Sequence, residues 1–353
     1  MQPRSFLLLL IVTVLAVAGA AAATLLNPVA TIATASAVPA LPKLAERGVE
    51  PAAIEVESAG GSYRLERRGV DGEAEPAWVL ATKDGYPASA DSVAQLLTAL
   101  AGLQLTERLT DDPQRLRRLQ LEPLDAREAR SRRVKVLATD GSVLADLFVG
   151  RTVARLVGET EGGTYVRLGD ETQAWLAAGS VSLPSDPLGF VDRRITTLPD
   201  DTVRRVVITH PDGTVVLAER ESAAQLLSVE TGLPPGTPAD PAQLRHLAQL
   251  LEQLSFEDVA AASAVTFPAE TVNSDVVSFD GIEVLMTLAE IDGQPWMRLS
   301  ARLAEEHSPV PERKEGAEAF AAALEAKTRG WVYQISPATY QRLTMKPAEL
   351  TGQ

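Results

Sequence analysis

Two stretches of the chain repeat one pattern of apolar and polar positions. Residues 85–105 read GYPASADSVAQLLTALAGLQL, and residues 236–256 align with them without a gap as GTPADPAQLRHLAQLLEQLSF. In both, apolar residues recur every three or four positions, which is the spacing of one face of an α-helix. Each stretch therefore predicts an amphipathic helix with one face against a core. The matching apolar pairs are Val93 and Leu244, Leu96 and Leu247, Leu100 and Leu251, and Leu103 and Leu254.

Both predicted helices begin with residues that can cap a helix. An N-cap side chain accepts a hydrogen bond from a backbone N–H group that has no partner inside the helix. Ser89 and Asp91 are the candidates in the first stretch. In the second stretch Asp240 precedes Pro241, and proline suits the first helical position.

Short alternating segments surround both helices and predict β-hairpins. Residues 54–57 and 63–66 alternate around two glycines, and residues 203–219 repeat this pattern. Further hairpin turns are predicted at Asp140-Gly141, Gly169-Asp170 and Asp280-Gly281. The predicted fold class is α+β, with two tandem repeats that each pack antiparallel hairpins on one long amphipathic helix.

The predicted repeats cover residues 47–198 and 199–346, followed by a tail at 347–353. Two segments are not shared between them. The first repeat has a basic stretch at 108–135, and the second has an insert at 300–329, with a predicted helix over 316–327, where the first has a short turn. Because folding explains the shared parts, the unshared segments are the candidates for partner contact. These candidates are Phe320 and Leu324, one helical turn apart, and Arg117, Arg118, Arg132 and Arg133.

The basic stretch has two interpretations. It is either a patch that binds anions or lipid headgroups, or a solvated face, since acidic residues are interspersed. Asp192-Arg193-Arg194, at the junction of the repeats, is likewise either a hinge ion-pair cluster or plain surface charge.

Residues 6–26, FLLLLIVTVLAVAGAAAATLL, contain no charge and follow Arg4. They are long enough to cross the roughly 30 Å hydrocarbon layer of a bilayer. Because Arg4 holds the short leading end in the cytoplasm, residues 1–26 predict a single-pass anchor, with the rest outside the cytoplasmic membrane on a tether at 27–46. A cleaved signal peptide is the alternative, because residues 20–22 and 35–37 are small.

Composition and the absence of known motifs limit the classes of ligand and reaction that the sequence predicts. The net charge of −14 argues against nucleic acid as a partner, and the absence of cysteine excludes disulfides and thiolate metal sites. The sequence has no G-x-S-x-G, P-loop, G-x-G-x-x-G or H-E-x-x-H motif. His210, His246 and His307 do not have metal-ligand spacing. We therefore expect no enzyme activity, cofactor or metal site.

The chain resembles a bacterial family called domain of unknown function 4340. The landmarks that carry the resemblance are Trp78, the segment 85–91, residues 119–123, 147–150, 163–166 and 174–176, and the junction at 190–194. The resemblance implies an N-terminal membrane helix followed by copies of this unit, and it supplies no catalytic residue. It also implies an accessory role, since members are often encoded beside components of an ABC exporter similar to gliding-motility proteins.

The function expected from these observations is a membrane-anchored extracytoplasmic accessory subunit of an ABC-type export or envelope machine, acting by protein–protein contact. The expected partners are the inner membrane, through the N-terminal helix, and a membrane protein. The alternative is a periplasmic ligand-binding module with a cleft between the two repeats.

We expect the mature protein to retain residues 1–26 and to stay with the membrane through a carbonate wash, because an uncleaved apolar helix is an integral anchor. Intact-mass measurement locates the N-terminus. A new N-terminus near Ala23 or Val38 would contradict the anchor and indicate a cleaved signal peptide.

Overall fold

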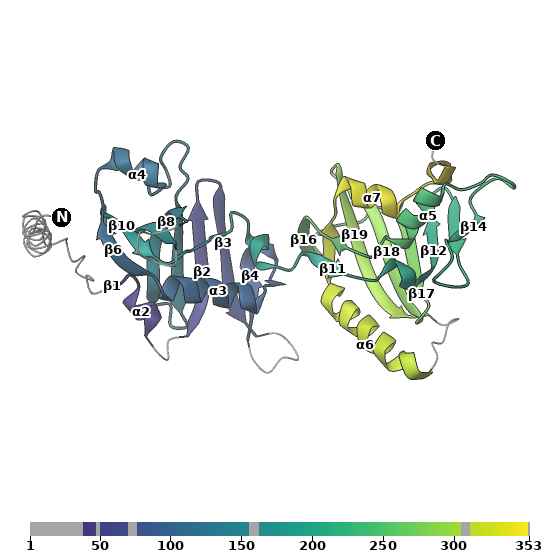
Figure 1. Ribbon diagram of the computed structural model, residues 1–353, viewed down its shortest axis with the longest axis horizontal. Helices are drawn as coiled ribbons and strands as arrows, with labels where there is room; N and C mark the ends of the chain where they lie inside the picture. The colour runs from purple at the N-terminus through teal and green to yellow at the C-terminus, as the bar shows by residue number, and fades with distance from the viewer. Residues whose placement is uncertain (1–37, 47–49, 70–75, 155–161, 305–310, 352–353) are drawn as a thin grey trace, which may run out of the picture. The chain divides into compact units, whose positions relative to one another are not determined.

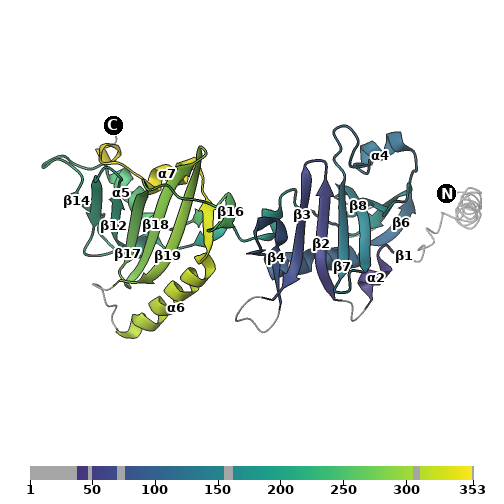
Figure 2. The same cartoon turned by 180° about the vertical axis from the view of Figure 1, so that it is seen from behind.

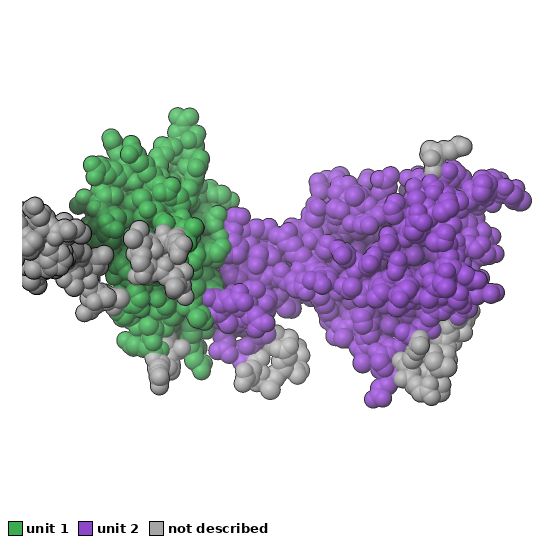
Figure 3. Space-filling model, viewed as in Figure 1, with its two compact units in different colours: residues 1–51, 56–61, 96–183 green, residues 52–55, 62–95, 184–353 purple. Residues whose placement is uncertain are grey.

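The computed structural model describes residues 38–46, 50–69, 76–154, 162–304 and 311–351. Contacts within the chain divide it into two compact units, coloured separately in Figure 3. Unit 1 comprises residues 1–51, 56–61 and 96–183, and unit 2 comprises 52–55, 62–95 and 184–353. The predicted anchor at 1–26, most of the tether and residues 305–310 of the insert lie outside the described residues. Within the described ranges, no helix has the length and apolar character needed to cross a membrane.

The first sheet has ten strands in the order β1-β6-β10-β9-β8-β7-β2-β3-β4-β5. The strands are β1 (Val38–Pro39), β2 (Pro51–Ser58), β3 (Gly61–Arg68), β4 (Ala77–Leu80), β5 (Tyr86–Pro87), β6 (Gln104–Arg108), β7 (Arg132–Ala138), β8 (Val143–Val153), β9 (Gly163–Leu168) and β10 (Ala174–Ala178). The predicted hairpin at Asp140-Gly141 joins β7 to β8, with Val134 opposite Leu147, and the one at Gly169-Asp170 joins β9 to β10. Helices α2 (Pro42–Ala45), α3 (Ala90–Ala101) and α4 (Pro113–Leu119) accompany this sheet.

Helix α3 is the first of the two predicted amphipathic helices. Ser89 is its N-cap, because the Ser89 hydroxyl accepts a hydrogen bond from the Ser92 N–H at 3.2 Å. Its apolar face is buried, because Val93 and Leu100 are fully covered and Leu96 is 5% exposed. Leu103, two residues after the end of the helix, is also fully covered. The helix lies across one face of the strands in Figure 1, and Figure 2 shows the opposite face, with β2, β3, β7 and β8 in front.

The second sheet lies in unit 2 and has eight strands in the order β14-β13-β12-β17-β18-β19-β20-β16, with a separate pair of β11 and β15. The strands are β11 (Arg194–Thr196), β12 (Val203–Thr209), β13 (Val215–Glu219), β14 (Ser228–Thr231), β15 (Leu254–Ser255), β16 (Asp258–Ala261), β17 (Val272–Ser278), β18 (Ile282–Ile291), β19 (Gln294–Leu303) and β20 (Trp331–Gln334). The helices are α5 (Pro241–Ala248), α6 (Pro311–Thr328) and α7 (Pro337–Leu343), and 3-10 turns are η1 (Ala81–Lys83), η2 (Pro187–Phe190), η3 (Asp200–Thr202) and η4 (Pro347–Thr351).

Helix α5 is the second predicted amphipathic helix, and it ends sooner than the pattern suggested. Asp240 is its N-cap, accepting from the Ala242 N–H at 2.8 Å, and Pro241 takes the first position. After Ala248 the chain leaves the helix, yet Leu251 and Leu254 are still buried. The apolar spacing therefore predicted correctly which residues are buried, including two that lie after the end of the helix.

Eight strands of the first sheet, all except its two edge strands β1 and β5, have the same order as the eight strands of the second sheet. Read from β16 to β14, the second sheet runs β16-β20-β19-β18-β17-β12-β13-β14, and the first runs β6-β10-β9-β8-β7-β2-β3-β4. Of these eight matched strands, three precede the amphipathic helix along the chain and five follow it in both sheets. The registered strand pairs are antiparallel, so the predicted α+β class with mainly antiparallel hairpins is confirmed.

An aromatic cluster fills part of unit 2. The Tyr86 ring lies edge-on to Trp331, with centroids 4.9 Å apart, and to Phe256 at 5.7 Å, and Tyr333 packs on Phe256 at 5.1 Å. Burial raises the pKa of both Tyr86 and Tyr333. Lys83 Nζ also contacts both carboxylate oxygens of Asp258, at 2.6 and 2.8 Å. The turn before α3 is therefore joined to β16 and β20 by apolar packing and by charge.

Leu100→Ala and Leu251→Ala should each lower the free energy of unfolding by about 2–5 kcal/mol, because each removes a fully covered side chain and leaves a cavity. Urea unfolding followed by circular dichroism measures the loss. Gln95→Ala, an exposed change on α3, is the control. A loss at Leu100 or Leu251 no larger than at Gln95 would show that these helices do not pack as described.

Candidate functional site

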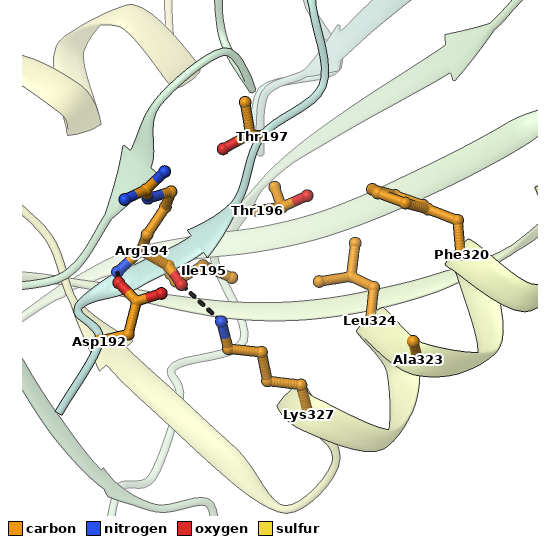
Figure 4. Close-up of a pocket in the computed structure, with 9 residues that line it drawn as sticks. All are labelled: Asp192, Arg194, Ile195, Thr196, Thr197, Phe320, Ala323, Leu324 and Lys327. Atoms are coloured by element: carbon orange, nitrogen blue, oxygen red, sulfur yellow. Dashed lines mark hydrogen bonds between the residues drawn. The ribbon is translucent and has the colours of Figure 1, made fainter. Parts of the chain in front are cut away.

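A pocket of about 420 Å³ lies between helix α6 and strand β11 in unit 2 (Figure 4). Its apolar part is formed by Ile195, Phe320, Ala323 and Leu324. Its polar part is formed by Asp192, Arg194, Thr196, Thr197 and Lys327. The pocket therefore has an apolar wall beside a charged end, a combination typical of sites that bind another molecule.

Helix α6 is held in place by a face of small and apolar residues. Ala317, Ala321, Leu324 and Thr328 are between 1% and 5% exposed, and they recur at the spacing of one helical face against β18 and β19. Glu325 adds a polar anchor, because its Oε2 accepts a hydrogen bond from the Ala301 N–H of β19 at 3.1 Å. The insert thus forms the predicted helix, and this helix covers part of the second sheet.

The two residues of α6 that were predicted to contact a partner, Phe320 and Leu324, differ in burial. Leu324 is 5% exposed, because it lies on the face that α6 turns toward the strands. Phe320 is half-buried at the pocket, where Figure 4 shows its ring beside Leu324. The strands bury Ala317, Ala321 and Leu324, so α6 is part of the packed core of unit 2. Whether either residue contacts a partner stays a prediction.

Strand β11 forms the other wall, and sequence reasoning missed its role. Ile195 and Thr196 are buried there, and β11 pairs with β15 through Arg194 opposite Ser255. The signal in the sequence was only one isoleucine after three charged residues, which does not by itself predict a pocket wall. At the junction, Arg193 pairs with Asp186 at 3.3 Å, and Asp192 accepts from the Arg194 N–H at 3.0 Å.

Lys327 joins the two walls at the charged end of the pocket. Its Nζ donates a hydrogen bond to the Arg194 carbonyl oxygen at 2.5 Å, drawn as the dashed line in Figure 4. Partial burial lowers the pKa of Lys327; the charge of Asp192 opposes this change and that of Arg194 adds to it. This contact ties the last turn of α6 to β11, so it helps to set the width of the pocket.

The four arginines predicted to contact a partner separate into two groups in unit 1. Arg117, Arg118 and Arg132 line surface hollows, whereas Arg133 is held within the sheet. Arg133 contacts both oxygens of Asp146 at 2.7 Å and lies over the Phe148 ring, and hydrogen bonding to Asp146 raises its pKa. Adjacent strand positions point to opposite faces, which explains why Arg132 and Arg133 differ.

The histidines and acidic residues do not form a metal centre in the described part of the chain, where no group of three or more candidate ligands comes together. His210 is buried with its Nε2 3.3 Å from the Met345 carbonyl oxygen, and His246 lies 3.4 Å from the Gln243 side-chain oxygen. His307 lies outside the described residues.

Comparison with known proteins identifies one family. The family model described as "Domain of unknown function (DUF4340)" matches residues 78–272, more than half of the chain. No curated protein and no solved structure matches the chain.

Leu324→Ala should lower the free energy of unfolding by about 2–5 kcal/mol, because it opens a cavity under α6. Phe320→Ala should lower the free energy of unfolding by a clearly smaller amount, since the Phe320 ring is already partly exposed to water. Chemical denaturation of both variants measures the difference. Equal losses would mean that α6 does not face the sheet through Leu324.

Proposed function

The chain belongs to the DUF4340 family, and we propose that it is an accessory subunit of the bacterial cell envelope that binds a membrane protein through the pocket between α6 and β11. We further propose that residues 1–26 anchor it in the inner membrane, with both units on the outer side. The proposed machine is an ABC-type exporter, and the proposed role is binding without catalysis.

The observation that carries this proposal is the pocket itself. Phe320 and Ala323 present apolar surface beside Leu324, and charged groups stand at one end. Protein interfaces gain most of their affinity from a few apolar or aromatic contacts surrounded by a polar rim. A pocket of about 420 Å³ accommodates one large apolar side chain of a partner, with Lys327 and Asp192 available at the rim.

The repeat organisation supports placing the contact here. We propose that residues 47–198 and 199–346 are two copies of one unit, on the basis of the identical strand order described above. Helix α6 stands where the other copy has only the turn at Gly169-Asp170. The pocket is therefore particular to the second copy, and the shared architecture does not account for it.

With the proposed membrane anchor, a small interface of low intrinsic affinity is enough for binding to a membrane partner. A protein held on the membrane by one helix has a high effective concentration toward other membrane proteins. An interface built around one pocket can then be occupied without a large buried area. This argument also suits a chain in which aromatic residues make up only 5%.

Ala323→Arg should reduce crosslinking to the membrane partner about tenfold or more, because a long charged side chain would fill the pocket and a central interface contact contributes about 2 kcal/mol or more. The measurement is crosslinking in native membranes followed by quantitative mass spectrometry of the proteins captured by each variant.

Ala322→Arg is the matched control for this experiment. It places the same side chain on the same helix, on the flank that lines a different hollow, beside β19. A partner that is lost with Ala323→Arg and kept with Ala322→Arg supports the proposal. Equal capture by both variants would exclude this pocket as the contact.

A further inference from the structure

Unit 1 contains two adjoining hollows of about 330 and 460 Å³ that share three side chains. The shared residues are Gln120, Arg130 and Arg151. Arg117 and Arg118 line the first hollow, and Arg132 lines the second, so five guanidinium groups surround one continuous depression. This site is separate from the pocket beside α6 and does not depend on the function proposed for it.

Among the residues that the structure describes, most of these arginines have no carboxylate partner. Arg117 pairs with Glu128 at 3.1 Å, whereas Arg118, Arg130, Arg132 and Arg151 form no ion pair with any residue that the structure describes. Arg132 donates to the Leu183 carbonyl oxygen, and Arg151 lies over the Tyr165 ring. Unpaired positive charge gathered in one place is unusual in a protein of net charge −14, and the mutual repulsion of these groups is relieved by a bound anion.

The loop that carries Arg130 is closed on itself. The Glu122 Oε1 accepts from the Arg130 N–H at 2.6 Å, and the Ser131 hydroxyl donates to the Glu122 carbonyl oxygen at 2.6 Å. Glu122 and Ser131 are 4% and 1% exposed, so these bonds lie away from water. The loop is thereby held in one arrangement before any ligand arrives, which lowers the entropy lost on binding.

The floor of the depression is equally constrained at Gly150. A Cβ atom at this position would lie 2.2 Å from the Leu119 carbonyl oxygen, so the chain from Leu119 to Leu121 crosses strand β8 where only glycine fits. Gln120 adopts a left-handed conformation with φ of 59° to make this crossing, and Leu121 is fully buried beneath it. The crossing brings Gln120, from one end of α4, beside Arg151 of β8.

Neutral hydrogen-bonding groups complete the second hollow. Thr152, Ser180 and Ser182 are exposed along its wall, together with the Gln120 amide. Guanidinium groups bind phosphate through paired, charge-assisted hydrogen bonds, whereas hydroxyl and amide groups suit the hydroxyls of a sugar or polyol. We propose that the depression binds a phosphorylated sugar or polyol, with the phosphate among the arginines and the hydroxyls toward Ser180 and Ser182.

Two carboxylates, those of Glu122 and Glu128, line the first hollow together with the arginines and offset part of their positive charge. Glu128 is already paired with Arg117, and the Glu122 side chain is buried under the first hollow. Among the described residues, the Glu122 Oε2 has no hydrogen-bond donor. This negative charge beneath the site weakens the attraction for anions, so Glu122→Gln should increase the affinity for the phosphate.

The test is isothermal titration of the purified protein with glucose 6-phosphate, inorganic phosphate and glucose as probes. We expect glucose 6-phosphate to bind more tightly than either of the other two. Arg118→Gln/Arg130→Gln should weaken it about tenfold or more, since one hydrogen bond to a charged group contributes roughly a factor of ten. Ser180→Ala/Ser182→Ala should weaken glucose 6-phosphate and leave inorganic phosphate unchanged.

Arg115→Gln/Arg127→Gln is the matched control, because it removes the same charge from the same segment outside both hollows. Equal weakening by the two double variants, with circular dichroism spectra unchanged, would show diffuse attraction and overturn the proposal. Absence of binding by all phosphate probes would also overturn it.

Vesicles of phosphatidylcholine with and without phosphatidylglycerol distinguish the source of the polyol phosphate. Sedimentation only with the phosphatidylglycerol vesicles, lost in Arg118→Gln/Arg130→Gln, would assign the site to a lipid headgroup. Binding of glucose 6-phosphate without vesicle binding would assign it to a soluble ligand. Failure of the pocket beside α6 to bind a partner would leave each of these results unchanged.

Discussion

The burial of one leucine-rich helical face against antiparallel strands is the interaction on which each sheet depends. Val93 and Leu100 on α3 lose all contact with water, as does Leu103 just after it, and Leu247 and Leu251 do so around α5. Each such side chain contributes about 1.5–3 kcal/mol by leaving water. Neither helix is long enough to be stable alone, so helix and strands stabilise one another.

Helix α6 shows how an addition to such a unit creates a binding surface. Strands β19 and β20 could be joined by a short turn, but here they are joined by a long segment that contains α6. The apolar side chains of this added segment must be buried against the rest of the unit. Ala317, Ala321 and Leu324 do this against the sheet, which leaves Phe320 at the margin. The partly exposed Phe320 forms one wall of the pocket beside β11. At the charged end of the pocket, Lys327 donates a hydrogen bond to the Arg194 carbonyl oxygen.

The arginines of unit 1 have two different roles, because some pack within the sheet and others line the surface hollows. Arg133 and Arg167 lie over Phe148 inside the sheet, with Arg133 neutralised by Asp146 and Arg167 donating to the carbonyl oxygens of Leu121 and Glu171. Arg118 and Arg130 form no ion pair with a residue that the structure describes, and Arg151 lies over the Tyr165 ring without a carboxylate partner among those residues. The first group stabilises the fold, and the second is available to a ligand.

The sequence by itself determined what depends on local spacing: the two amphipathic helices, the hairpin turns, the helix in the insert and the buried leucines. It also determined the α+β class, because period and turn chemistry are properties of neighbouring residues. It left open whether Ser89 or Asp91 caps α3, and it gave no reason to separate Leu324 from Phe320 or Arg133 from Arg132. Only the structure decided these. The cap depends on the local backbone geometry at Ser89, and the other two depend on which distant strand a side chain meets. The pocket wall at Ile195 and the crossing over Gly150 could not be predicted from the sequence either. Each brings together segments that are far apart along the chain, and no repeating pattern of residues relates those segments.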